Sequence, residues 1–418
     1  MSKNNKGNVF AIAIMFFLFA MISFVTGLQN PMGIIAKAQF GATNLMSQLG
    51  NAANFIAYAF MGLPAGFLLK GKGYKFTALA AVTIGFVGVG ISYLSGVFSS
   101  FVIYLLGAFV SGFSMCMLNT VVNPLLNTLG GGGNRGNQLI QLGGSCNSLA
   151  ATIVPVLAGY LIGEVTEKTQ VADVNPALFI AMAIFALAFT IIFFSNIPEP
   201  ELEAEAAEGK VEKEGTLDSI KGALSHRNLV FGVIAIFLYV GIEVGIPNVA
   251  NLYMTSADGL GLAAGVAGAL VGAYWFLMLC GRLIGGAIGG KVSSRAMMIS
   301  VSSAAILFIL LGMFLPSSWT INILEANVPV AILFFVVCGL CTSVMWGAVF
   351  NLAVEGLGKY TSIASGLFMV MVCGGGIVPL VQGAVADKAG YINSYWVLIV
   401  ALAYILWFAL FGSRTNKE

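Results

Sequence analysis

Carboxamide side chains recur within stretches of the chain that are otherwise apolar. The ones of interest are Gln29, Asn30, Asn119, Asn123, Gln141, Asn147, Asn248, Asn251 and Asn351. Each Asn or Gln carries N–H donors and a carbonyl acceptor, so it matches a ligand hydroxyl that both donates and accepts a hydrogen bond. Because lipid-facing positions favour apolar side chains, these residues predict a polar cavity enclosed by helices.

Three aromatic residues, Tyr274, Trp275 and Trp346, lie in stretches of the same kind. Their rings can stack on the apolar face of a pyranose, so amides and aromatics together favour a sugar as the ligand. A drug carrier would favour an apolar lining. A carrier of organic anions would need a buried cation, for which Arg282 is the only candidate.

A single buried amide has a structural alternative, because hydrogen bonds between neighbouring helices are common in membranes. For any one amide the two interpretations stay open. For Gln29, Asn119 and Asn147 taken as a set, we interpret the side chains as cavity lining.

Glu243 is the one acidic residue deep inside an apolar stretch. Burying an unpaired carboxylate is costly, so we expect this group to be protonated, paired with a cation or hydrated. The hypothesis is that Glu243 carries a proton or accepts a hydrogen bond from a ligand hydroxyl. The structural alternative is a neutral Glu bonded to a neighbouring helix.

The composition indicates that most of the chain is surrounded by lipid rather than water. Of 418 residues, 59% are hydrophobic and 9% are charged, with a net charge of +2. Soluble domains carry about 25% charged residues, which excludes a soluble enzyme, a nucleic-acid binder and a disordered chain. The one histidine, His226, lies in a polar segment and the cysteines form no metal-ligand spacing, so we expect no metal, no cofactor and no enzymatic activity.

Twelve apolar runs are long enough to cross a bilayer as helices. They are residues 8–36, 45–69, 76–96, 100–127, 138–162, 176–196, 228–254, 262–288, 296–315, 328–354, 362–385 and 392–412. The runs are continuous rather than alternating, so spanning strands are not expected. The predicted fold class is an all-α membrane protein with twelve transmembrane helices.

Lys and Arg residues in the loops predict the orientation. With the N-terminus placed in the cytoplasm, fifteen of them fall inside and three outside, and Arg282 lies within a span. Positive charge accumulates on the cytoplasmic side of membrane proteins, so both termini are predicted to be cytoplasmic.

The chain divides into two related halves. A charged linker at 197–227 separates six spans at 1–196 from six spans at 228–418. The motif from Ile153 to Gly159 in the fifth span matches the motif from Ile377 to Gly383 in the eleventh. Parallel repeats of this kind predict two pseudo-symmetric six-helix bundles, which is the plan of major facilitator transporters.

Several motifs extend over essentially the whole chain. They are Leu118-Asn119-Thr-Val-Val-Asn123-Pro124, Asn147-Ser-Leu149 ahead of Val154-Pro155, Leu63-Pro-Ala-Gly66 with Gly73-Tyr74-Lys75, Phe237-Leu-Tyr-Val-Gly241-Ile-Glu243-Val, and Gly281-Arg282 with Gly285. With these motifs the chain resembles the fucose–galactose–glucose:proton symporters of the major facilitator superfamily. The resemblance implies a secondary transporter that imports a monosaccharide by alternating access.

The chain also departs from the family pattern. Gln29-Asn30 stands where the family commonly has Asn-Asp, and Asn119 stands where fucose carriers have Glu. Gly144 stands where the family has Gln, while Glu243 is present as in the glucose/galactose branch. Proton coupling is therefore assigned to Glu243, with a sodium-coupled carrier or an uncoupled uniporter as alternatives.

The expectations for the site follow from these observations. The amides listed above, Glu243 and the three aromatics are expected to bind the sugar, and Lys75, Arg282 and Glu355 are expected to act in loops or gates. Glu355 would pair with Lys359 one turn later, or form a surface ion pair. We expect a monomer in a bacterial inner membrane, driven by a proton or sodium gradient and binding no nucleic acid. A metabolite or drug exporter and a non-transporting sugar sensor remain as alternatives.

Overall fold

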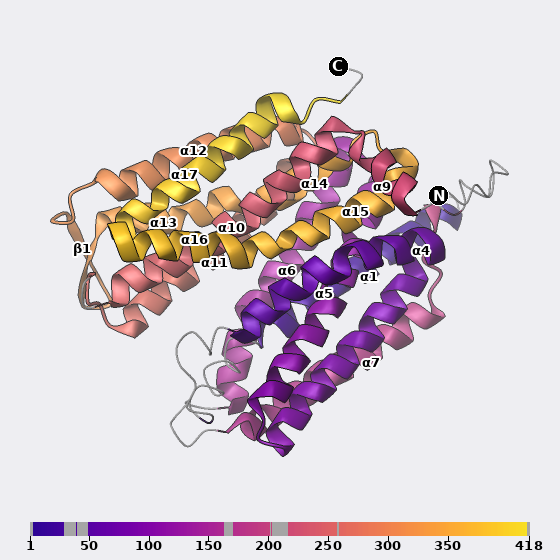
Figure 1. The fold of residues 1–418 in the computed structure, drawn as a ribbon, viewed down its shortest axis with the longest axis horizontal. Helices are drawn as coiled ribbons and strands as arrows, with labels where there is room; N and C mark the ends of the chain where they lie inside the picture. The colour runs from indigo at the N-terminus through magenta and orange to yellow at the C-terminus, as the bar shows by residue number, and fades with distance from the viewer. Residues whose placement is uncertain are drawn as a thin grey trace. The chain divides into compact units, whose positions relative to one another are not determined.

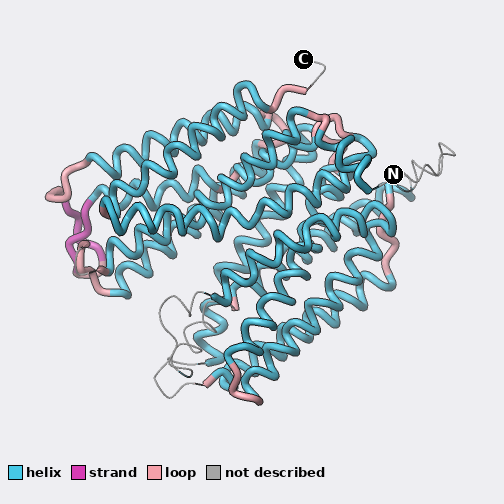
Figure 2. The backbone as a smooth tube through the Cα atoms, in the orientation of Figure 1, coloured by secondary structure: helices cyan, strands magenta, loops and turns pink. Residues whose placement is uncertain are grey.

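The computed structural model describes residues 3–28, 39, 49–162, 170–200, 202, 216–256 and 259–415, and these residues are almost all helical (Figures 1 and 2). The elements are α1 (Lys3–Gly27), α4 (Leu49–Val97), α5 (Phe101–Leu129), α6 (Gly133–Ile162), η1 (Val171–Val174), α7 (Asn175–Phe194), α9 (Thr216–Leu224), α10 (Arg227–Thr255), α11 (Ala264–Ile288), α12 (Ser294–Phe314), β1 (Thr320–Ile323), β2 (Ala326–Pro329), α13 (Val330–Thr342), α14 (Met345–Val354), η2 (Gly358–Tyr360), α15 (Thr361–Val370), η3 (Met371–Cys373), α16 (Gly374–Ala389), α17 (Tyr391–Trp407) and the π-helical turn η4 (Phe408–Gly412).

Ten stretches among the described residues are helical, long and apolar enough to cross a membrane. One of them, Ala52–Val97, covers both the second and the third predicted span. Helix α6 covers the fifth predicted span and is not among the ten. Each of the twelve predicted spans therefore corresponds to helix in the described part of the chain.

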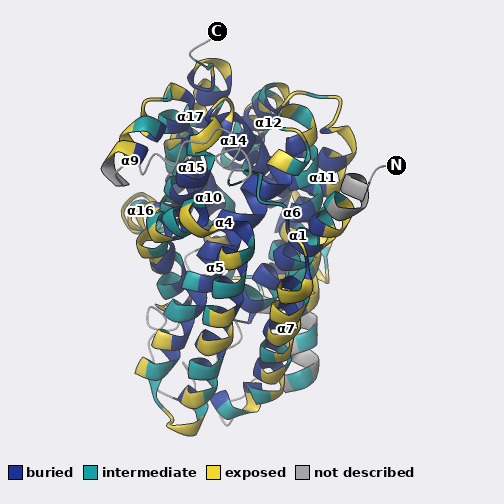
Figure 3. Cartoon of the chain, turned by 90° about the vertical axis from the view of Figure 1, so that its right-hand side faces the viewer, coloured by how far each residue is buried: buried dark blue, intermediate teal, exposed yellow. Residues whose placement is uncertain are grey.

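Helix α7 carries large apolar side chains on its surface. Along α7, Phe179, Leu187, Phe193 and Phe194 are all exposed. Figure 3 shows exposed residues in yellow along this helix. Large apolar side chains at such positions suit lipid, whereas in water they would form a costly patch.

The chain departs from helix between α12 and α13. Strands β1 and β2 pair antiparallel with Thr320 opposite Pro329, and they form the magenta hairpin in Figure 2. Leu324 and Glu325 form its two-residue turn with φ of 50° and 64°, which is the conformation of a tight hairpin turn. The hairpin joins the ninth and tenth predicted spans, and its four-residue strands are too short to cross a membrane.

Two predicted spans are broken rather than continuous. The tenth is interrupted at Ser343 and Val344, between α13 and α14. The eleventh is interrupted by η3, just before Gly374-Gly-Gly376. A break exposes backbone groups that a regular helix would satisfy, so these are places where side chains can bind the backbone.

Helix α4 is also two helices joined at Gly73, whose φ of 80° favours glycine. The Glu199 carboxylate accepts hydrogen bonds from the backbone N–H groups of Tyr74 (2.6 Å) and Lys75 (2.8 Å). A carboxylate at this position accepts hydrogen bonds from N–H groups that have no partner within the helix. Its negative charge also interacts favourably with the positive end of the helix dipole. Lys75 also donates from Nζ to the Ser195 carbonyl at 2.8 Å, so this predicted loop residue binds the C-terminal end of α7.

Packing divides the chain into two compact units. The first comprises Met1–Leu129, Cys146–Ala223 and Leu357–Val370, and the second comprises Gly130–Ser145, Leu224–Gly356 and Met371–Glu418. Each unit thus includes a segment from the other half of the sequence. The predicted domain boundaries at 196 and 227 stay a prediction.

Glycine allows a close helix contact inside the first unit. A Cβ added to Gly366 of α15 would lie 2.6 Å from the Gly62 carbonyl oxygen and 2.9 Å from the Gly66 Cα of α4. Such distances leave no room for a side chain, and the neighbours are rigid backbone. Nearby, the Ser365 hydroxyl donates to the Thr120 carbonyl at 3.1 Å.

We predict that Gly366→Ala lowers the thermal unfolding temperature of the detergent-solubilised protein, with a cost of about 1–3 kcal/mol for the overpacked contact. Gly383→Ala in α16 is the matched control, because no described atom lies within 4 Å of its added Cβ. Equal unfolding temperatures for the two variants would contradict the α4–α15 contact.

Candidate functional site

The charged part of the candidate site is an ion pair in the second unit. Arg282 of α11 places Nη2 3.3 Å from Oε1 of Glu243 on α10, and the two side chains are 10% and 14% exposed. Of the three states expected for Glu243, the structure therefore contains the one paired with a cation. Such a pair satisfies charges whose separate burial would be costly.

Arg282 also binds two backbone carbonyls. Its Nη1 donates to the Gly144 oxygen of α6 at 3.0 Å, and its Nε approaches the Ser343 oxygen at 3.4 Å. Ser343 lies at the break between α13 and α14. A planar guanidinium carries five donors, which allows one side chain to bind three acceptors on three different elements.

Gly144 leaves space for this arrangement. A Cβ at Gly144 would contact the Arg282 Cδ at 3.4 Å, so a longer side chain there would compete with the guanidinium for the same space. Gly144 stands where the family that the sequence resembles has Gln. The space taken by the Arg282 side chain is a physical reason for the smaller residue here.

The predicted aromatics have different surroundings. The Tyr274 hydroxyl is buried and lies 3.1 Å from both the Glu243 carbonyl and the Thr342 hydroxyl. Trp346 is half-buried and packs edge-on to Tyr239 at 6.3 Å. Trp275 is 37% exposed and packs edge-on to Tyr274. Tyr274 thus supports the backbone that carries Glu243, while Trp346 and Trp275 keep accessible surface.

Sequence reasoning missed Tyr239. Its side chain is buried, and its hydroxyl interacts with the side chains of Glu243 and Arg282. The sequence signals were its place in the motif from Phe237 to Val244 and its position four residues before Glu243, one helical turn away.

A second polar cluster lies in the first unit. Asn119 of α5 donates from Nδ2 to the Tyr58 hydroxyl of α4 at 3.1 Å and to the Met115 carbonyl at 3.1 Å. Asn123 donates from Nδ2 to the Asn119 carbonyl at 2.8 Å.

Asn147 is half-buried and donates to the Phe19 carbonyl of α1 at 3.0 Å. Tyr58 was not predicted, since one Tyr in an apolar run carries no distinct signal.

Two other predicted site residues hold helices together within the second unit. Gln141 of α6 donates from Nε2 to the Val344 carbonyl at 2.7 Å, and Asn351 of α14 donates to the Ser294 hydroxyl of α12 at 2.9 Å. Both side chains are buried. These contacts are of the helix–helix kind that was the alternative to ligand binding.

The remaining predicted residues are spread out. Asn248 and Asn251 are exposed on α10, and Glu355 is exposed after α14, where its carbonyl accepts a hydrogen bond from Asn228 at 2.9 Å. Gln29 and Asn30 lie outside the described residues. A contact between Glu355 and Lys359 stays a prediction.

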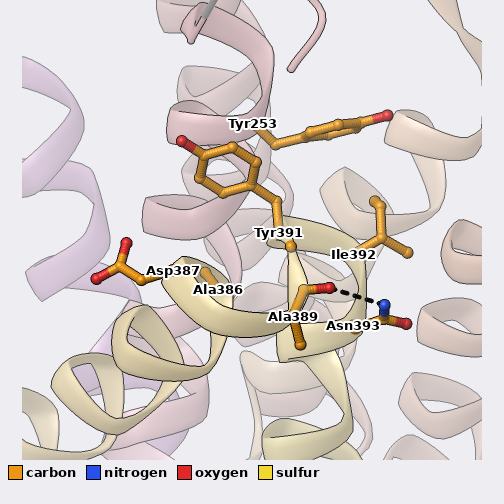
Figure 4. Close-up of a pocket in the computed structure, with 8 residues that line it drawn as sticks. Tyr253, Ala386, Asp387, Ala389, Tyr391, Ile392 and Asn393 are labelled. Atoms are coloured by element: carbon orange, nitrogen blue, oxygen red, sulfur yellow. Dashed lines mark hydrogen bonds between the residues drawn. The ribbon is translucent and has the colours of Figure 1, made fainter. Parts of the chain in front are cut away.

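A surface pocket of about 380 Å³ lies elsewhere in the second unit, where α10 ends and α16 meets α17. Figure 4 shows Tyr253, Tyr391 and Asp387 around it, with Asn393 bonded to the Ala389 carbonyl at 2.9 Å. None of the predicted site residues lines this pocket. Within the described part of the chain, no group of three or more His, Cys, Asp or Glu side chains could hold a metal ion.

Comparison with known proteins identifies the family. The model of the Major Facilitator Superfamily matches residues 12–379. A glucose/galactose transporter from Brucella abortus is 30% identical over 99% of this chain and 96% of its own length. The L-fucose-proton symporter of Escherichia coli is 23% identical over 96% of this chain and 92% of its own.

The fold agrees with solved structures. A crystal structure of a single-residue variant of the E. coli fucose:proton symporter superposes with a TM-score of 0.81 at 21% identity, covering 98% of this chain and all of the other. The chain belongs to the Major Facilitator Superfamily and is a multi-pass membrane protein. The predicted fold class and family are confirmed.

We predict a non-additive response of stability to loss of the ion pair. Arg282→Gln or Glu243→Gln alone should each lower the free energy of unfolding by about 3–5 kcal/mol, since each leaves a buried charge without its partner. The double variant should lose less than the sum of the two single losses.

The measurement is thermal or denaturant unfolding of the four proteins in the same detergent. Additive losses would mean that the two side chains do not interact in solution.

Proposed function

We propose that this protein imports a monosaccharide by alternating access, coupled to a cation through Glu243. The observation that carries the proposal is the match over nearly the whole length to a relative named glucose/galactose transporter. The Asn119–Tyr58 cluster and the half-buried Asn147 supply the donors and acceptors that suit hydroxyl groups. On this proposal the protein is no enzyme and needs no cofactor beyond an ion gradient.

Proton coupling is the preferred form of the proposal. Glu243 is a carboxylate with little exposure, and its partner is the guanidinium of Arg282. A bound proton would remove the charge of Glu243 and weaken this pair. The relative named L-fucose-proton symporter supports the same form, with sodium coupling and uncoupled uniport as alternatives.

The setting of the proposal follows the loop charges. We place the protein as a monomer in a bacterial inner membrane with both termini in the cytoplasm. Gln29, Asn30, Asn119, Asn123, Asn147 and Trp346 are the proposed sugar contacts. Gln141 and Asn351 also stay proposed contacts, although their amides bind other helices, as those of Asn119 and Asn147 do.

The test is counterflow in proteoliposomes with a panel of labelled hexoses, deoxyhexoses and N-acetylhexosamines. We expect exchange of at least one hexose or deoxyhexose, and accumulation of that sugar when a proton gradient is imposed. Binding without exchange would identify a sugar sensor instead. Neither binding nor exchange of any sugar, together with drug sensitivity of a deletion strain, would identify an exporter.

We predict that Glu243→Gln abolishes accumulation driven by a proton gradient and leaves counterflow in place, because an amide cannot take up and release the proton. Glu325→Gln in the exposed hairpin turn is the control and should behave as the parent. If Glu243→Gln retains both accumulation and its pH dependence, Glu243 does not carry the proton.

A further inference from the structure

The first half of α6 binds backbone carbonyls of two other helices through its side chains. Gln138 donates from Nε2 to the Gly286 carbonyl of α11 at 3.0 Å. Gln141 donates from Nε2 to the Val344 carbonyl, just before α14, at 2.7 Å. Three residues further along, the Gly144 carbonyl accepts from Arg282 of α11 at 3.0 Å. We call these three hydrogen bonds the α6 contact.

The α6 contact depends on glycine. A Cβ on Gly286 would lie 2.6 Å from the Leu142 Cδ2, and a Cβ on Gly347 would lie 2.8 Å from the Gln141 Nε2. The helices therefore approach closely enough for amide side chains to reach main-chain oxygens. A contact made in this way can separate without exposing a large apolar surface.

Arg282 is the residue that connects the α6 contact with Glu243. Its guanidinium binds the Glu243 carboxylate with Nη2 and the Gly144 carbonyl with Nη1. Its Nε points to the Ser343 carbonyl at the break before α14. The same planar group is thus held by the proposed coupling residue on one side and by α6 on the other.

We propose that Arg282 is a positioning residue that links the charge of Glu243 to closure of the α6 contact. While Glu243 is charged, it holds the guanidinium where Nη1 can bind Gly144. When Glu243 loses its charge, the buried guanidinium loses its counter-charge, turns toward water or another acceptor, and releases α6. Linkage is reciprocal, so separation of α6 from α11 in turn changes the affinity of Glu243 for a proton or ligand.

This inference rests on the proposed function, because alternating access requires that some helix contacts open in each cycle. It adds a specific site of opening, between α6 and both α11 and α14, and a specific cause. The opening is triggered by the charge at Glu243 and transmitted by one side chain.

The experiment measures opening of the α6 contact directly. Leu142 is half-buried and packs on Gly286, so a cysteine at this position reports separation of α6 from α11. We would place Leu142→Cys in the full chain, with the six native cysteines replaced by Ser or Ala. The rate of alkylation by N-ethylmaleimide is then compared between the parent and the variants Glu243→Gln, Arg282→Gln, Arg282→Lys and Glu243→Gln/Arg282→Gln.

We expect Glu243→Gln and Arg282→Gln each to raise the alkylation rate about tenfold, within the usual range of coupling between sites. The double variant should stay as reactive as Arg282→Gln, because Gly144 still lacks its donor although the charges are removed. Arg282→Lys should keep its unfolding temperature near that of the parent and still be reactive, since an ammonium group lacks the planar fork that binds both acceptors. Lys291→Gln removes an exposed cation at the end of α11 and should not change the rate.

Two results would overturn the inference. If the double variant returns to the parent rate, Arg282 serves only to neutralise Glu243. If Glu243→Gln leaves the rate unchanged while its unfolding temperature falls, the charge of Glu243 does not control the α6 contact. Exchange of labelled D-glucose, D-galactose and L-fucose by the parent is measured in parallel, and its absence would count against the proposed function without altering the alkylation result.

Discussion

The buried pair of Arg282 and Glu243 is the interaction on which the proposed mechanism depends. A guanidinium inside a membrane protein is favourable only if its charge and its donors are satisfied together. Here the Glu243 carboxylate supplies the opposite charge, and the Gly144 and Ser343 carbonyls accept hydrogen bonds from other N–H groups of Arg282. One side chain thereby joins α6, α10, α11 and the break between α13 and α14.

The interruptions of the helices are part of the same arrangement. In lipid, a backbone carbonyl that leaves the helical pattern needs another donor. Arg282 supplies a donor at Ser343, where the tenth span is broken. Gln141 donates to the next carbonyl, that of Val344, which also accepts the backbone N–H of Ala348. Glycines such as Gly286 and Gly347 let the donors come close. Polar side chains thus act both as candidate ligand contacts and as supports for irregular backbone.

The candidate site could be predicted only in part from the sequence. The isolation of Glu243 in an apolar run identified a costly group that needed a partner, and Arg282 was recognised as the only cation within a span. That the two form a pair, and that Tyr274 and Tyr239 surround it, depends on which helix faces meet. For the amides, residue type could not separate Asn119, bonded to Tyr58, from Asn351, bonded to Ser294.

The sequence by itself determined that the protein lies in a membrane, its twelve spans and its family, because long apolar runs and short motifs are local properties of the chain. Tertiary structure decided the break at Ser343, the cap that Glu199 places on the second part of α4, and the partners of Arg282. The cap and the Arg282 contacts join residues that are distant along the chain. Such contacts depend on helix approach distances and side-chain directions, and a linear pattern of residue types does not contain either.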